Sequence, residues 1–141
     1  MLPKWHALFG FVFAYVLYWF TSMNMFEASL IFLSSVLIDF DHYVWIVKRK
    51  GYFNLKQAYL WHKALPKNHK PIMNIFHTIE FIIFIFILTF FWKVFLYVLM
   101  GMLFHSVLDI IDIYYNSKIG CREFSLIRYL ILNKKNPRKY L

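Results

Sequence analysis

The sequence has little of what an ordinary soluble domain is built from. Its 141 residues include only four glycines, four prolines and 16 % charged residues, whereas 61 % of the residues are apolar and 23 % are aromatic. So few turn-forming residues argue against long loops, and so little charge argues against a fully hydrated surface. The single cysteine, Cys121, excludes an internal disulfide. The length allows one domain.

Acidic residues are the scarcest charged class, with seven Asp and Glu against 16 Lys and Arg. Five of the seven lie inside apolar stretches, at Asp39, Asp41, Glu80, Asp109 and Asp112. This placement is the reverse of what a solvated surface would show, because charged side chains are seldom buried unless they are paired.

Four apolar stretches of about 20 residues are each long enough to cross ~30 Å of hydrocarbon. They cover residues 7–25, 28–47, 72–92 and 94–115. Lipid offers no partner to free backbone groups, so the stretches are predicted to be helices. The connectors after the first and third stretches are short, which implies antiparallel neighbours. The sequence therefore predicts an all-α membrane protein with a bundle of four transmembrane helices.

Two basic segments flank the last two stretches. Segment 48–71 carries seven Lys and Arg among aromatic and aliphatic residues, which predicts an amphipathic interfacial helix that ends near Pro66. The tail, residues 118–141, also carries seven and is predicted to be a basic amphipathic cytoplasmic tail after a transmembrane domain of residues 1–117. Basic residues collect on the cytoplasmic side, so we expect a multi-pass protein of the cell membrane with both termini cytoplasmic.

An N-terminal signal peptide is the alternative for the first stretch. No small-residue cleavage site follows it, however, and cleavage would also remove His6.

The ionisable residues of the apolar stretches fall at similar depths. With ~1.5 Å of rise per helical residue, each lies within about 15 Å of the predicted cytoplasmic end. They share this depth although the chain direction alternates from one stretch to the next. The residues are His6, Asp39, Asp41, His42, His77, Glu80, His105, Asp109 and Asp112. We therefore expect them to meet in one leaflet.

Helical spacing tests this expectation. His105, Asp109 and Asp112 follow one stripe of a helix, because they are four and three residues apart. Asp41 instead falls about 200° from Asp39 at ~100° per residue. Either Asp41 points elsewhere or the helix loosens there.

Five carboxylates in one leaflet need compensation, because each costs ~2.5–3.5 kcal/mol to insert. The four stretches contain no Lys or Arg at these positions, whereas divalent cations would supply the missing charge. Imidazole and carboxylate ligands suit zinc, with manganese or iron as alternatives, and the ligand count predicts two or three ions. For each residue taken singly, the alternative is a hydrogen bond between helices, worth about 0.6 kcal/mol.

The position of each candidate residue in the sequence suggests its role at the site. The predicted metal ligands are His6, Asp39, Asp41, His42, His77, Glu80, His105 and Asp109. The candidate catalytic carboxylates are Asp112 and Asp41, and the candidate substrate-binding residues are Lys63, Lys67, His69 and Lys70. The alternative for the lysines is contact with anionic headgroups. Ser34, Ser35 and Ser106 are small residues that allow close helix packing.

These motifs resemble the YdjM-like family of small membrane-bound metal-dependent hydrolases, a distant relative of zinc-dependent phospholipase C and P1 nuclease. The matching residues are His6 with Gly10, Asp39-Phe40-Asp41-His42, His77, and Gly101 with His105-Ser106-Val107-Leu108-Asp109. The resemblance implies hydrolase activity and favours Asp41 as a ligand. The chain departs from the family pattern at Leu37-Ile38, where the family has Leu-Pro, and at His69-Lys70, which matches a family His-Arg only loosely.

The predicted function is metal-dependent hydrolysis of a phosphoester in a lipid or lipid-like substrate at the cytoplasmic leaflet. Membrane lipids are the expected partners, and no nucleic acid is expected. Three alternatives stay open: a metal or proton transporter, a non-catalytic protein that metal staples together, and an intramembrane metalloprotease. The transporter is disfavoured because residues 11–20 and 82–91 are almost purely apolar. The protease is disfavoured because the sequence has no His-Glu-x-x-His motif.

Overall fold

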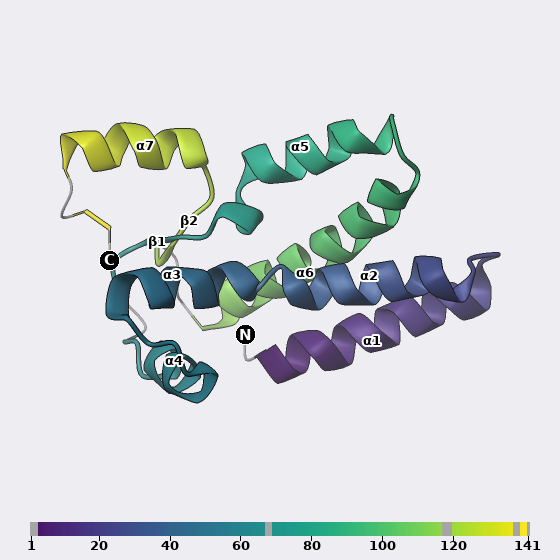
Figure 1. The fold of residues 1–141 in the computed structure, drawn as a ribbon, viewed down its shortest axis with the longest axis horizontal. Helices are drawn as coiled ribbons and strands as arrows, with labels where there is room; N and C mark the ends of the chain where they lie inside the picture. Colours follow the sequence, from purple (N-terminus) through teal and green to yellow (C-terminus); the bar gives the residue numbers. More distant parts are fainter. Residues whose placement is uncertain (1–2, 67–68, 117–119, 137–138, 141) are drawn as a thin grey trace.

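The computed structural model describes residues 3–66, 69–116, 120–136 and 139–140, and they are mostly helical (Figure 1). The α-helices are α1 (Pro3–Phe20), α2 (Met25–Leu37), α3 (Phe40–Lys50), α4 (Leu55–Lys63), α5 (Ile79–Thr89), α6 (Val94–Tyr115) and α7 (Leu126–Lys135). A 3₁₀ turn, η1 (Ile75–His77), and two short strands, β1 (Ile72–Met73) and β2 (Arg122–Glu123), complete the set.

Helix α2 packs against both α1 and α6, and α5 packs against α6 (Figure 1). Two close approaches between these helices have a glycine on one helix and a serine on the other. A Cβ atom added to Gly10 would lie 2.2 Å from Ser35 Oγ, and one added to Gly101 would lie 2.2 Å from the carbonyl oxygen of Ile31 and 2.0 Å from Ser34 Oγ. The prediction of small-residue packing at Ser34 and Ser35 is confirmed.

The second apolar stretch is two helices rather than the single helix predicted over 28–47. Helix α2 ends at Leu37, a turn follows at Ile38 and Asp39, and α3 begins at Phe40. The two helices run on in nearly the same direction (Figure 1). The helix therefore loosens at Asp39, which is the second of the two outcomes that the spacing of Asp39 and Asp41 left open.

The prediction of one helix over 72–92 is wrong. Residues 72–73 form β1, residues 75–77 form η1, and α5 starts only after Thr78, whose hydroxyl oxygen accepts a hydrogen bond from the Phe81 N–H. Helix α5 has 11 residues and is about 16 Å long, roughly half of the ~30 Å hydrocarbon core. The cause is a pairing with a distant segment. Backbone groups of β1 form hydrogen bonds with the tail, not the local hydrogen bonds of a helix.

That pairing ties the tail to the rest of the chain. Strand β1 runs parallel to β2, with Ile72 opposite Arg122, and the Ile79 N–H donates to the Phe124 carbonyl at 2.9 Å. At the end of the tail, the Tyr140 hydroxyl donates to Glu123 Oε2 at 2.8 Å. Burial, together with this carboxylate, raises the pKa of Tyr140 to about 12. The tail is thus anchored at both sides of Arg122.

Two helical stretches, Met25–Lys50 and Val94–Tyr115, are long and apolar enough to cross a membrane by length and composition. Helix α1 starts at Pro3, earlier than the predicted residue 7, so His6 lies in its first turn. Segment 48–71 does not form one helix. Its first residues belong to α3, which continues through Lys50, and α4 covers Leu55–Lys63, so α4 ends before Pro66.

Replacing Gly101 with alanine should destabilise the protein by about 1–3 kcal/mol, because the new methyl group overlaps the Ile31 backbone. The thermal unfolding midpoint in detergent measures this effect. Ser106→Ala is the matched control on α6, because the Ser106 hydroxyl bonds only to the Met102 carbonyl of its own helix among the described hydrogen bonds. Equal midpoints for Gly101→Ala and the wild type would refute the close approach of α2 and α6.

Candidate metal centre

Three histidines and three aspartates from four separate segments meet where α2 turns into α3. Asp39 lies in that turn, Asp41 in the first turn of α3, His77 in η1, and His105 in the middle of α6. The side chains of Asp41, His77, His105 and Asp109 are buried. His6 joins them from α1, where its ring stacks on His105 with a centroid distance of 4.0 Å. These six are among the nine ionisable residues that the sequence predicts to meet, whereas Glu80 does not join them.

His105 directs an electron pair into this cluster. Its Nδ1 lies 2.7 Å from the Ser35 carbonyl oxygen, which can only accept, so Nδ1 carries the proton. In the neutral ring, Nε2 is then unprotonated, and it faces Asp109 Oδ2 at 3.2 Å and Asp39 Oδ1 at 3.4 Å. Three electron-pair donors therefore face one another.

His77 adds a fourth donor in the same way. Its Nδ1 lies 3.2 Å from Asp41 Oδ2, which also accepts the Phe76 N–H at 2.9 Å. The His77 Nε2 atom then points at His105 Nε2, 3.3 Å away, with Asp39 Oδ1 and Asp109 Oδ2 each at 3.6 Å. Such a convergence is stable only with protons or a cation among the four atoms, because like partial charges repel.

Two sets of residues have the geometry to hold a metal ion. Asp39, His77, His105 and Asp109 form the first, and Asp41, His42 and His77 form the second. Each set offers ligand atoms that lie within 4.8 Å of one another. Both sets need His77, and in the first set the Nδ1 of His77 is engaged by Asp41. A carboxylate that holds the far nitrogen of a ligating histidine is the usual support of a metal site, so Asp41 fits that orienting role better than a ligand role.

His6 and His42 lie at the edge of the first set. His6 Nε2 donates to Asp109 Oδ1 at 3.2 Å, which fixes the orientation of that carboxylate. The other ring nitrogen of His6, Nδ1, is buried and has no hydrogen-bond partner among the described residues. His42 Nε2 lies 3.6 Å from Asp39 Oδ1 and accepts from Arg122 Nη2 at 3.2 Å.

Arg122 is the residue that sequence reasoning missed. Its Nη1 forms an ion pair with Asp109 Oδ2, and its side chain lies in the cluster although it comes from the tail. The only sequence signal was its place in the basic tail, where it resembles six other Lys and Arg residues. The pairing of β1 with β2, which carries Arg122 to the site, leaves no pattern in a single sequence.

Glu80 does not belong to the cluster, and its prediction as a metal ligand is wrong. Sequence spacing places Glu80 on one helix face with His77, but the extended backbone of Thr78 separates them. The Glu80 carboxylate instead accepts from Ser125 Oγ at 2.6 Å and from the Leu126 N–H at 2.9 Å. It therefore caps the start of α7.

A cavity of about 760 Å³ opens beside the cluster. From the cluster it is lined by Asp39, His42, Asp109 and Arg122, and from the surrounding segments by His62, Lys63, His69 and Asp112, among others. Its volume lies within the range of small-molecule sites. Asp41 is not among the described residues that line it, which again separates Asp41 from a catalytic role.

Only some of the predicted substrate-binding residues line this cavity. Lys63 and His69 line it, whereas Lys70 is exposed and does not. Lys67 lies outside the described residues. Asp112 lines the cavity, and its Oδ1 accepts from Asn116 Nδ2 at 2.9 Å. Burial lowers the pKa of His62, so the ring that this residue adds to the wall is neutral at pH 7.

No family model, no curated protein and no solved structure matches this chain.

The matched carboxylate-to-amide changes Asp39→Asn and Glu80→Gln should distinguish a metal ligand from a residue that only caps α7. Asp39→Asn removes the negative charge of one of the four donors and leaves only a weakly ligating amide oxygen, so the purified variant should lose most of its bound transition metal. Glu80→Gln should retain the wild-type metal content and should lower only the unfolding midpoint, since it weakens the cap of α7. Elemental analysis of the detergent-purified proteins measures both effects. Equal metal content in the two variants would contradict this assignment of the ligands.

Proposed function

We propose that this chain is an integral membrane metal-dependent hydrolase that cleaves a phosphoester of a lipid or lipid-like substrate. The observation that carries the proposal is the four-donor set of Asp39, His77, His105 and Asp109 at the edge of a cavity. A structural metal site is closed by protein ligands, whereas a catalytic site keeps one side open to water and substrate. The adjoining cavity supplies such an open side.

Membrane insertion is supported by the outer surface of the helices. Large apolar side chains are exposed at the end of the bundle away from the cluster, including Phe20, which is 85 % exposed, and Phe90, which is 75 % exposed. Exposed apolar area of this kind is unfavourable in water and favourable in lipid. We place both termini on the cytoplasmic side of the cell membrane, because the two basic segments lie there together. In this arrangement α1 is a third span, and α5, about 16 Å long, crosses about half of the hydrocarbon core.

One divalent cation balances the charge of the cluster. The carboxylates of Asp39, Asp41 and Asp109 contribute three negative charges, and Arg122 contributes one positive charge. Since Glu80 caps α7 and Asp112 belongs to neither metal-holding set, fewer carboxylates need compensation than the sequence implied. We therefore propose one ion, with zinc favoured by its preference for histidine and carboxylate, in place of two or three.

A bound divalent cation would lower the pKa of a water molecule toward neutrality and polarise a phosphoryl oxygen. The residues of this chain would do the rest. Asp112 lies on the cavity wall and is the candidate general base. Asp41 holds the ring of His77, and the Ser35 carbonyl holds the ring of His105. In these orientations the Nε2 atom of each ring points into the four-donor set. Lys63 and His69 lie on the cavity wall and are the candidates to bind an anionic headgroup.

Hydrolysis of a phosphoester panel by the purified protein tests this proposal. The metal is removed by chelation and zinc, manganese or iron is restored. We expect activity to require the metal, and Asp112→Asn to lower kcat by about 100-fold or more, because a general base contributes at least that much. Glu27→Gln is the control, because Glu27 bonds to Tyr97 and Lys93 at the opposite end of the bundle.

A protein that loses thermal stability on chelation but hydrolyses none of the esters would be a metal-stapled membrane protein. Metal flux across proteoliposomes without hydrolysis would instead support a transporter.

A further inference from the structure

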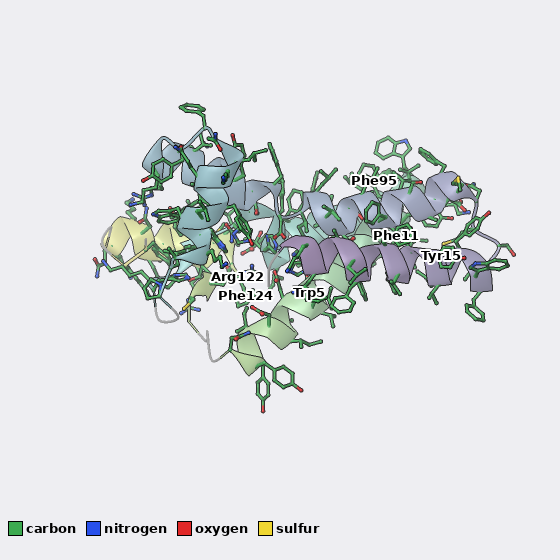
Figure 2. The ribbon with its side chains drawn as sticks, turned by 90° about the horizontal axis from the view of Figure 1, so that it is seen from below. Trp5, Phe11, Tyr15, Phe95, Arg122 and Phe124 are labelled. Atoms are coloured by element: carbon green, nitrogen blue, oxygen red, sulfur yellow. The ribbon has the colours of Figure 1, made fainter. Side chains whose placement is uncertain are left out.

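Arg122 is held in place from both sides. On one side the Ile72 N–H donates to the Cys121 carbonyl at 3.0 Å, and on the other the Ile79 N–H donates to the Phe124 carbonyl at 2.9 Å. Figure 2 shows Arg122 in the middle part of the molecule together with Trp5, the neighbour of His6, and far from Tyr15. These backbone hydrogen bonds fix the main chain of Arg122 beside the cluster.

The Arg122 guanidinium contacts two residues of the cluster. Its Nη1 pairs with Asp109 Oδ2, which is the oxygen that also faces His77 and His105, and its Nη2 donates to His42. These contacts use two of the five N–H groups that an arginine offers. The side chain is 14 % exposed and is part of the cavity wall.

We propose that Arg122 forms an anion subsite that binds the phosphoryl oxygens of the substrate beside the metal, an inference that rests on the proposed function. A planar guanidinium binds two oxygens of a phosphate in parallel, which lysine cannot do. At this position it would also hold the phosphorus within reach of a cation bound by Asp109.

The same placement makes Arg122 a competitor of the metal ion. Both positive groups use Asp109, and two like charges at close range repel. An anion that binds between them relieves this repulsion. The binding of metal alone should therefore be weakened by Arg122, whereas the binding of phosphate to the metal-loaded protein should depend on it.

The cavity has room for more than a phosphate ion. Its volume of about 760 Å³ leaves space for the group esterified to the phosphate, and Lys63 and His69 also line it. The substrate class that fits is a phosphoester whose second group is partly apolar, because Ile46, Leu55 and Ile113 also line the cavity.

Titration of the full chain in detergent with zinc, and then of the zinc-loaded protein with inorganic phosphate, tests the subsite by calorimetry. Arg122→Gln keeps a hydrogen-bond donor near Asp109 but removes the charge. We expect this variant to bind zinc about tenfold more tightly and phosphate about tenfold or more weakly. Arg122→Lys restores the charge without the planar fork and should recover only part of the phosphate affinity.

Arg128→Gln is the matched control in the same tail, because Arg128 is exposed and lies 3.7 Å from Glu123. Its zinc and phosphate affinities should stay within about twofold of the wild type, as expected for a surface ion pair.

The possible outcomes distinguish a failure of the anion subsite from a failure of the proposed metal-dependent function on which it rests. Phosphate affinity that Arg122→Gln leaves unchanged would overturn the subsite while the metal centre stands. Weaker zinc binding in Arg122→Gln would also overturn it, because Arg122 would then merely support the fold. A wild-type protein that binds no zinc would overturn the proposed function and the inference together.

Discussion

The structure depends on one electrostatic constraint: four electron-pair donors share a small volume and need positive charge among them. Imidazole nitrogens of His77 and His105 face carboxylate oxygens of Asp39 and Asp109 at 3.2–3.6 Å. Each imidazole is turned this way by a hydrogen bond at its other nitrogen. Such an arrangement needs a cation or protons among the four atoms, because buried carboxylates without a positive partner are costly.

Several features of the fold serve this constraint. The glycine at position 101 brings α6 against α2, which places His105 Nδ1 at the Ser35 carbonyl. The turn between α2 and α3 lets Asp39 and Asp41 face the same cluster, which a continuous helix would forbid. The short pairing of β1 with β2 adds Arg122 from the tail. The site thus joins segments that lie up to 116 positions apart in the chain, from His6 to Arg122.

The sequence predicts the gathering of the histidines and aspartates because their shared depth and helical spacing are local properties. It also predicts close packing at Ser34 and Ser35. It does not predict the break of the third stretch, because the partner of β1 lies about 50 residues away and short strands leave no periodicity. The misassignment of Glu80 and the omission of Arg122 both follow from that one missed pairing, since the tail satisfies Glu80 and supplies Arg122.

X-ray absorption at the metal edge of the purified, zinc-reconstituted protein tests the central claim most directly. The account predicts a first coordination shell of nitrogen and oxygen at about 2.0–2.2 Å, with the multiple-scattering pattern of two imidazoles and no sulfur. A protein that binds no zinc, or a shell of water oxygens alone without imidazole, would show that the cluster is neutralised by protons and by Arg122, and would contradict the account.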